Sequence, residues 1–151
     1  MSLEQDIQQE HFRSEKQKAF INILYTYHQA VSATNAIFKD KGITRQQFNV
    51  LRILRGQHPG AASVGLIKER MLDKMSDASR IVERLRLKGL IIRAQSNKDK
   101  RAADISISKT GLQLLNQIDP LILEYEEQNI KLTDDEATTL NTLLDKFRNG
   151  K

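Results

Sequence analysis

A short polar loop between two apolar runs constrains this chain more than any other feature of its sequence. The loop is Gln95–Ala102, and the runs beside it are Leu90–Ile92 and Asp104–Ile107. In the second run Ile105 and Ile107 alternate with polar residues, which is the pattern of a half-buried strand. Two helix-like segments precede the loop, so the order predicts a helix-turn-helix followed by a two-stranded hairpin, or wing. One helix and one basic hairpin on the same side of a small domain are an arrangement suited to binding a duplex nucleic acid.

Charge is distributed unevenly along the chain. Residues 41–109 carry 16 basic and 6 acidic side chains and therefore have a net charge of +10. Residues 1–40 and 110–151 together have a net charge of −5, which leaves the whole chain at +5. A solvated charged face is the simplest alternative, but segregation of this size favours a surface that binds phosphate groups.

Composition narrows the class of protein. The 151 residues, of which 39% are hydrophobic and 28% are charged, suffice for one ordinary globular domain. No apolar run approaches the ~20 residues that span a bilayer, and the polar, acidic N-terminus is unlike a signal peptide. The chain has no Cys, which excludes disulfides, thiolate metal sites and a cysteine redox switch. We therefore expect a cytoplasmic protein with no membrane partner.

No constellation typical of an enzyme is present in the sequence. His11, His28 and His58 are scattered, without carboxylates at metal-ligand spacing. The chain also lacks a Walker loop and a glycine-rich dinucleotide motif. We therefore predict no catalytic residue, no metal site and no cofactor, and we expect a protein that is not an enzyme.

The first part of the chain predicts two helices. Apolar residues from Phe12 to Phe38 recur with the period of a long amphipathic helix, which we place within residues 8–40. Thr44–Gln47 is a capping box at the start of the next helix, which is expected to run to about Arg55. Apolar residues cover more than one face of this second helix, so it should be buried on two sides.

Two further helices precede the wing. Ser63 is expected to cap a short helix that ends near Met71, and Ser76 to cap a helix that ends at Gly89. The apolar residues of the second of these helices gather on one face and its polar residues on the other. The apolar face holds Ala78, Ile81, Val82 and Leu85, and the polar face holds Ser76, Asp77, Ser79, Arg80, Glu83 and Arg84.

Helical periodicity resumes at Ser108 and continues towards the C-terminus. Pro120 should either kink this helix or mark a fresh start with Asp119 as N-cap. Thr133–Glu136 is a second capping box. The last helix is expected to bury Ala137, Leu140, Leu144 and Phe147. The terminal helices carry more apolar residues than a small central domain can cover, so they should pack on each other and on a second subunit.

Several short segments resemble one family, and they occur in the order of that family. They are Gly42–Leu51, Ser63–Ile67, Ser76–Leu85, Lys88–Ile91, Asp99–Arg101 and Ile107–Gly111. Each is weak alone, but together they resemble the MarR family over nearly the whole chain. The resemblance implies a mainly α fold: a winged helix-turn-helix with a small β-hairpin wing, flanked by N- and C-terminal helices that form a dimer stalk.

Under this resemblance residues 1–151 form a single MarR-like domain. Residues 43–107 are its DNA-binding unit, and residues 8–40 and 109–148 form its helical dimerisation region. The resemblance implies a homodimeric transcription regulator whose recognition helix enters the major groove of double-stranded DNA, while the wing residue Arg101 enters the minor groove. Many members release DNA when they bind small aromatic compounds, so a small aromatic ligand is implied as well. The oxidant sensors of the family use cysteine, which excludes that branch here.

The candidate DNA contacts lie on the two helices of the helix-turn-helix and on the wing. They are Ser63, Ser76, Asp77, Ser79, Arg80, Arg84, Lys98, Asp99, Lys100 and Arg101. Arg101 sits in a polar loop where a core role is impossible, and it suits the narrow, electronegative minor groove. We expect Asp99 to pair with Arg101 and to aim its guanidinium. Lys98 and Lys100 are expected to contact phosphate, and a solvated loop charge is the alternative for Arg101.

The recognition helix offers two arginines one helical turn apart. Arg80 and Arg84 suit bidentate contact with guanine or with phosphate. The alternative for them is a surface ion pair with Glu83 or Asp77. Ser79 can donate to bases or phosphate, whereas the two serines expected as N-caps could serve only as caps. Asp77 departs from the Ser or Thr common in the family, and its carboxylate could accept from a cytosine amino group.

Tyr25 and His28 on the first long helix are candidate ligand-binding residues, because they could line a cavity against the two-sided second helix. Packing in the core or at an interface is the alternative for both. The leading hypothesis for the whole chain is a ligand-responsive repressor that binds a pseudo-palindromic operator as a homodimer. The alternative is a winged-helix module for protein–protein interaction without DNA binding, which would need neither the basic segment nor the arginine in the wing.

Overall fold

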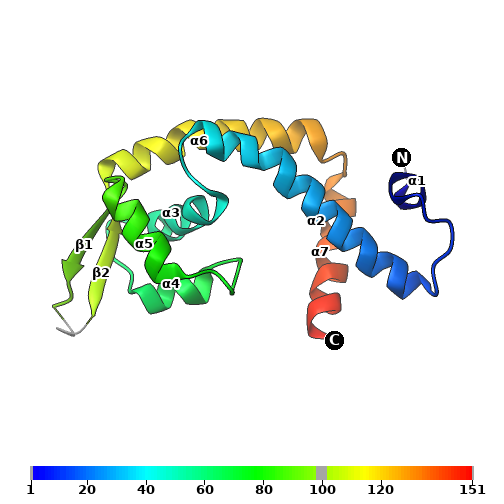
Figure 1. The fold of residues 1–151 in the computed structure, drawn as a ribbon, viewed down its shortest axis with the longest axis horizontal. Helices are drawn as coiled ribbons and strands as arrows, with labels where there is room; N and C mark the ends of the chain where they lie inside the picture. Colours follow the sequence, from blue (N-terminus) through cyan, green and yellow to red (C-terminus); the bar gives the residue numbers. More distant parts are fainter. Residues whose placement is uncertain (1, 98–101, 151) are drawn as a thin grey trace. The chain divides into compact units, whose positions relative to one another are not determined.

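The structure, a computed structural model, describes residues 2–97 and 102–150 (Figure 1). Its elements are α1 (Leu3–Ile7), α2 (Glu15–Asp40), α3 (Arg45–Gln57), α4 (Val64–Arg70), α5 (Ala78–Leu87), β1 (Ile91–Gln95), β2 (Ala103–Ile107), α6 (Lys109–Asn129) and α7 (Asp134–Asn149). The predicted mainly helical class and the hairpin wing are therefore confirmed. In the described part of the chain, no helix is both long and apolar enough to cross a membrane.

The chain divides into two compact units, residues 1–118 and residues 119–151. The core of the first unit is formed by α3, α4, α5, the wing strands and the beginning of α6. Its fully buried aliphatic side chains include Leu51, Leu54, Ile67, Leu85, Ile105 and Leu115. Each side chain of this kind stabilises the fold by about 1.5–3 kcal/mol through burial. α3 buries Phe48, Val50, Leu51 and Leu54, so the predicted two-sided burial of this helix is confirmed.

Side-chain caps begin most of the helices where the sequence predicts them. At the start of α3 the backbone N–H of Gln47 donates to the Thr44 hydroxyl, and the N–H of Thr44 donates to the Gln47 side chain, both at 3.1 Å. Ser63 accepts from the N–H of Leu66 at the start of α4. A second capping box joins Thr133 and Glu136 at the start of α7. These three predicted helix starts are confirmed.

The N-cap predicted for α5 is wrong by one residue. Asp77, rather than Ser76, accepts from the N–H of Arg80 at 3.1 Å, and α5 begins at Ala78. A carboxylate satisfies a free backbone donor there and also interacts favourably with the positive end of the helix dipole. At the other end of α5, Gly89 has a φ of +70° and follows the C-cap, as predicted.

The wing is an antiparallel pair whose root is held by the segment before α4. β1 and β2 pair from Ile91 with Ile107 to Gln95 with Ala103. Ile105 and Ile107 are buried, which confirms the predicted alternation in the second strand. Ala62 exchanges two backbone hydrogen bonds with Ile105, at 2.8 and 2.9 Å. The hairpin is therefore anchored to the core at its root.

The N-terminal helix is shorter than the sequence predicts. α2 begins at Glu15, with Ser14 as its N-cap, and the separate short helix α1 precedes it. Lys18 on α2 donates to the carboxylate of Glu4 on α1, and this ion pair ties the two helices together.

α6 begins after Ser108, as predicted, and runs without interruption through Pro120. The fresh start predicted at Asp119 is therefore wrong. Pro120 has no N–H, so the helix lacks one backbone hydrogen bond at this point. Near its beginning α6 approaches the wing closely, because a Cβ on Gly111 would lie only 2.3 Å from the carbonyl oxygen of Leu90. Only glycine fits this position without a shift of the backbone.

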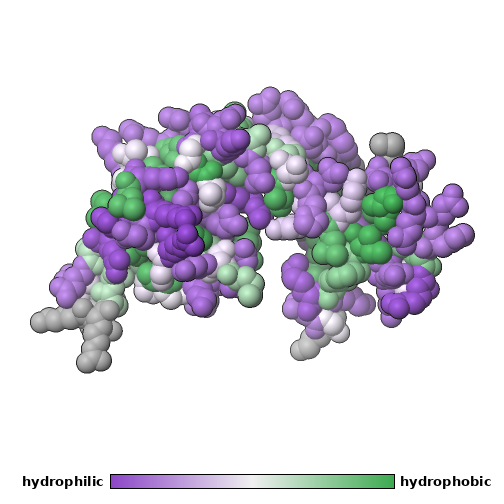
Figure 2. Space-filling view, viewed as in Figure 1, coloured by the Kyte–Doolittle hydropathy of each residue, from purple (hydrophilic) through white to green (hydrophobic). Residues whose placement is uncertain are grey.

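In the second unit, large apolar side chains of α7 are partly exposed. Leu140, Leu143 and Phe147 are 44%, 57% and 51% exposed, and Figure 2 shows hydrophobic surface in the region of this helix. The expected burial of Leu140 and Phe147 is not reached within one chain, and Ala137 and Leu144 are only partly buried. Apolar residues at this spacing form a stripe along one side of a helix. The stripe has the character of a surface that needs a partner.

Candidate nucleic-acid interface

α5 divides its side chains between the core and the solvent. Ala78, Val82 and Leu85 are buried. Ser79, Arg80 and Arg84 are exposed on the opposite side. The structure therefore brings these three candidate contacts onto one exposed helix surface.

The two arginines of this surface have no ion-pair partner among the residues that the structure describes. Glu83, one alternative partner, is engaged by Arg86, which donates to its two carboxylate oxygens at 2.7 and 3.0 Å. Asp77, the other alternative, accepts a backbone N–H at the start of the helix. The guanidinium groups of Arg80 and Arg84 are therefore available to an external anion.

Glu83 also connects the helix to the wing. Its Oε2 lies 4.0 Å from the guanidinium of Arg93 on β1. Hydrogen bonding from Arg86 lowers the pKa of Glu83, and the same contact raises the pKa of Arg86. The sequence analysis did not identify Arg86 or Arg93, although the i, i+3 spacing of Glu83 and Arg86 on a helix was an available signal.

The serines at the helix starts differ in their environment. The Ser63 hydroxyl accepts from a backbone N–H of α4, and its own proton remains able to donate. Ser76 does not cap α5. Its backbone N–H donates to the carbonyl of Asp73 at 3.2 Å, within the turn between α4 and α5.

The tip of the wing carries four candidate contacts that lie outside the described residues: Lys98, Asp99, Lys100 and Arg101. Their roles remain predictions from the sequence. The described strands end at the pair of Gln95 and Ala103, from which the tip segment continues.

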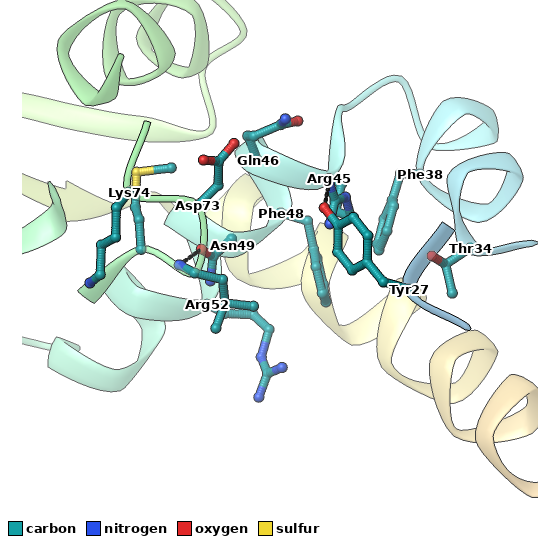
Figure 3. A pocket seen from close by; sticks show the side chains of 12 residues that line it. Tyr27, Thr34, Phe38, Arg45, Gln46, Phe48, Asn49, Arg52, Asp73 and Lys74 are labelled. Atoms are coloured by element: carbon teal, nitrogen blue, oxygen red, sulfur yellow. Dashed lines mark hydrogen bonds between the residues drawn. The ribbon is translucent and has the colours of Figure 1, made fainter. Parts of the chain in front are cut away.

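A cavity of about 440 Å³ lies between α2, α3 and the turn that leads into α5 (Figure 3). Aromatic and basic side chains line much of it: Tyr27, Phe38 and Phe48, with Arg45, Arg52 and Lys74. Arg45 donates to the Tyr27 hydroxyl at 3.1 Å, and its guanidinium lies 5.5 Å from the centre of the Tyr27 ring. Rings beside cations suit a small aromatic anion.

The two ligand-binding candidates from the sequence lie near this cavity but do not line it. Tyr25 lines a separate hollow against α1, and its hydroxyl accepts from Gln29 at 2.9 Å. His28 makes an edge contact with Tyr27, with 5.5 Å between the ring centres. Tyr27 and Arg45 were not among the ligand-binding residues predicted from the sequence, although the two-sided burial of α3 pointed towards a cavity at this place. In the described chain, no group of three or more metal-ligating side chains is gathered at one point.

The sequence of this chain is similar to those of known proteins. Residues 41–102 match the sequence profile of the MarR family. The HTH-type transcriptional regulator MhqR of Bacillus subtilis is 27% identical over 128 residues, which cover 84% of this chain and 87% of MhqR. The HTH-type transcriptional repressor IacR of Pseudomonas putida is 29% identical over 87 residues, which cover 57% of this chain and about half (52%) of IacR.

Solved structures share the fold over most of the chain. The organohalide-sensing regulator RdhR, in its 2,4-dichlorophenol-bound form, has a TM-score of 0.80 at 21% identity and covers 95% of this chain and 87% of its own. A mutant MarR from E. coli, complexed with operator DNA, has a TM-score of 0.73 at 23% identity and covers 97% of this chain and 99% of its own. In the order of its elements, the capped helix-turn-helix, the anchored wing and the match over residues 41–102, the chain is similar to the MarR family of winged-helix transcriptional regulators.

Proposed function

We propose that the protein is a transcriptional repressor that binds a pseudo-palindromic operator in double-stranded DNA as a homodimer. The observation that carries this proposal is the exposed face of α5, where Arg80 and Arg84 have no ion-pair partner among the described residues. The guanidinium group presents several donors in a fixed fork that matches the edge of guanine or a phosphate. The net charge of +10 over residues 41–109 adds long-range attraction to DNA.

The local geometry of α5 supports its role as the recognition helix. Helix-turn-helix proteins contact base edges with residues near the N-terminus of the second helix. The cap at Asp77 puts Ser79 and Arg80 in the first turn of α5. Asp77 itself is occupied by this cap, which argues against the cytosine contact considered from the sequence.

The apolar stripe on α7 supports the homodimer. A stripe of this kind is rarely left in water when a second copy can cover it. Two-fold symmetry of the protein requires two-fold symmetry of its site, with half-sites about 10 bp apart. The proposal assigns no catalytic activity to the protein and places it in the cytoplasm.

Selection of bound sequences from a random duplex pool tests the proposal. We expect an inverted repeat, and an affinity that falls steeply with salt because neutralised phosphates release counterions. The double variant Arg80→Ala, Arg84→Ala should lose the enrichment while its circular dichroism stays that of the parent. A module for protein–protein interaction, the alternative function, would enrich no sequence from the pool.

We also propose that the cavity binds a small aromatic anion that weakens operator binding. The rings of Tyr27 and Phe48 beside Arg45 and Arg52 support this ligand class. A ligand can change DNA affinity only if it prefers one arrangement of the recognition helices over another. Thiol oxidation is not available as a signal, because the chain has no Cys.

Calorimetric titration with benzoate and with 2,4-dichlorophenol tests the ligand proposal. Arg45→Ala should weaken binding by at least about 10-fold, the scale of one charge-assisted hydrogen bond. Lys16→Ala removes a cation of α2 outside the cavity and should leave the affinity unchanged. Equal binding by the parent and Arg45→Ala would contradict the assignment of the cavity.

A further inference from the structure

The turn between α4 and α5 contains an apolar residue that packing does not hold in place. Leu72 is 87% exposed, although the preceding residue, Met71, is buried. A hydrogen bond holds Leu72 instead, because its backbone N–H donates to the side-chain oxygen of Asn49 on α3 at 2.9 Å (Figure 3). Asn49 therefore fixes the start of this turn against α3.

The rest of the turn is held by its own hydrogen bonds. The N–H of Met75 donates to the carboxylate of Asp73 at 3.0 Å, and the N–H of Ser76 donates to the carbonyl of the same residue. Asp77 follows directly and caps α5. The turn therefore runs from Leu72 through these hydrogen bonds directly into the cap of α5.

Asn49 lines the cavity as well. The same wall contains Leu72, Asp73 and Lys74, so an occupant of the cavity meets the turn directly. An anion in the cavity accepts hydrogen bonds, so it favours side chains that turn a donor group towards it. Rotation of the Asn49 amide, which turns its NH₂ group towards the anion, takes its oxygen away from the N–H of Leu72. One side chain thus stands between the bound ligand and the position of α5.

We propose that Asn49 is a positioning residue that couples the cavity to the recognition helix. Its hydrogen bond to Leu72 holds the turn in the arrangement that binds DNA, and an aromatic anion acts by breaking that bond. This inference rests on the proposed function, since it specifies how the ligand response of the same protein is transmitted.

Three variants of the full chain separate this role from a general structural one. Asn49→Leu keeps the size of the side chain but removes the acceptor, whereas Asn49→Asp keeps an acceptor oxygen. Gln57→Ala removes an amide side chain from α3 outside the cavity. By amide hydrogen exchange, Leu72 should exchange at least about 10-fold faster in Asn49→Leu, as expected for the loss of one hydrogen bond. It should stay near the parent rate in the other two variants.

Operator binding gives the second measurement, with the selected site as probe. Asn49→Leu should bind about 10-fold more weakly than the parent without ligand, and Asn49→Asp within about 3-fold of it. Saturating benzoate should weaken operator binding by the parent and by Gln57→Ala equally. It should change binding by Asn49→Leu less than about 3-fold, because the bond that the ligand breaks is already missing.

The outcomes distinguish the inference from the function on which it rests. Unchanged exchange of the Leu72 amide in Asn49→Leu overturns the inference, whether or not the protein binds DNA. Parent-like affinity together with a full benzoate response in Asn49→Leu overturns it too. If the parent binds no selected site, the proposed function fails. If neither benzoate nor 2,4-dichlorophenol alters operator binding by the parent, the proposed action of the ligand on Asn49 fails. The proposed role of Asn49 in positioning α5 is then decided by amide exchange of Leu72 and by operator affinity without ligand.

Discussion

The core of the first unit and the helix α7 use the same kinds of side chain with opposite results. Leu51 and Leu54 on α3 are fully buried within one chain. Leu140 and Phe147 on α7 are about half exposed in the same chain. The first unit therefore contains a fully buried hydrophobic core, whereas α7 presents a stripe of partly exposed apolar side chains.

This difference separates two tasks within one small protein. The helix-turn-helix and the wing obtain their geometry from local caps and from a core of their own, so the surface proposed to bind DNA is formed in a single chain. The apolar surface of α7 is suited to association, because large exposed patches of this kind mark interaction sites. Variants in the core of the first unit should consequently lose folding stability, whereas variants in the apolar stripe of α7 should lose association.

The largest effect is expected from the core of the first unit. Leu51→Ala should lower the free energy of unfolding by about 2–5 kcal/mol, because it removes buried methyl groups and leaves a cavity. Leu72→Ala is the control, since that side chain is almost fully exposed, and it should change stability by less than about 0.5 kcal/mol. Urea denaturation followed by circular dichroism measures both. Equal losses would show that the two positions do not differ as the structure describes.

A charge on α7 should disrupt association rather than folding. Leu140→Asp would bury an unpaired carboxylate in a dimer, which should raise the dimer dissociation constant at least about 100-fold. Sedimentation at micromolar concentration should show about twice 17.3 kDa for the parent and a monomer for the variant. Asn141→Asp adds the same charge to the neighbouring residue outside the stripe and should remain dimeric. A monomeric parent that still binds its operator tightly would contradict the proposed homodimer.

The wing tip should affect DNA binding alone. Arg101→Ala should weaken operator binding by about 1–3 kcal/mol, the usual scale for one arginine contact. Asp99→Ala should weaken it too if Asp99 aims Arg101, although simple electrostatics predicts tighter binding after the loss of an acid. The double variant should then lose much less than the sum of the single losses. Tighter binding by Asp99→Ala in a fluorescence anisotropy titration would refute the aiming role.

The smallest effect is expected at α1, which an ion pair ties to the first unit. The hydrogen bond from Lys18 is the main cause that lowers the pKa of Glu4 from 4.5 to about 2. Because the folded pKa is the lower one, this contact stabilises the docked helix fully above about pH 4.5 and is lost as the pH falls towards 2. An NMR titration of the Glu4 carboxyl should show the low midpoint, and Lys18→Ala should raise its pKa towards 4.5. An unshifted pKa of Glu4 in the parent would contradict the ion pair between Glu4 and Lys18 in solution.

The parts of the fold that were predictable from the sequence depend on short-range chemistry. The capping boxes at Thr44 and Thr133 involve residues only three positions apart, and the wing depends on the alternation of neighbouring residues. Ser76 and Asp77 are both good N-cap residues, so the sequence alone did not decide between them. In the structure Ala78 is the first residue of α5 and is buried in the core, so the residue before it, Asp77, is the N-cap.

The cavity was not predictable in the same way. Its walls combine residues of α2, such as Tyr27, with α3 and with the turn at Leu72, which are far apart in the chain. Helical periodicity indicated that α3 has neighbours on two sides, but not which side chains of α2 would face it. Periodicity likewise located the apolar stripe of α7, but it holds no information about what covers that stripe.

The two backbone bonds between Ala62 and Ile105 separate the anchorage of the hairpin from its tip. Both residues are buried, so the root of the hairpin belongs to the core. Because the anchor lies at the root, we expect that the tip sequence can be replaced while the strands and their attachment to the core are kept. In evolutionary terms, substitutions at the tip would then change what the hairpin contacts while the scaffold is inherited intact.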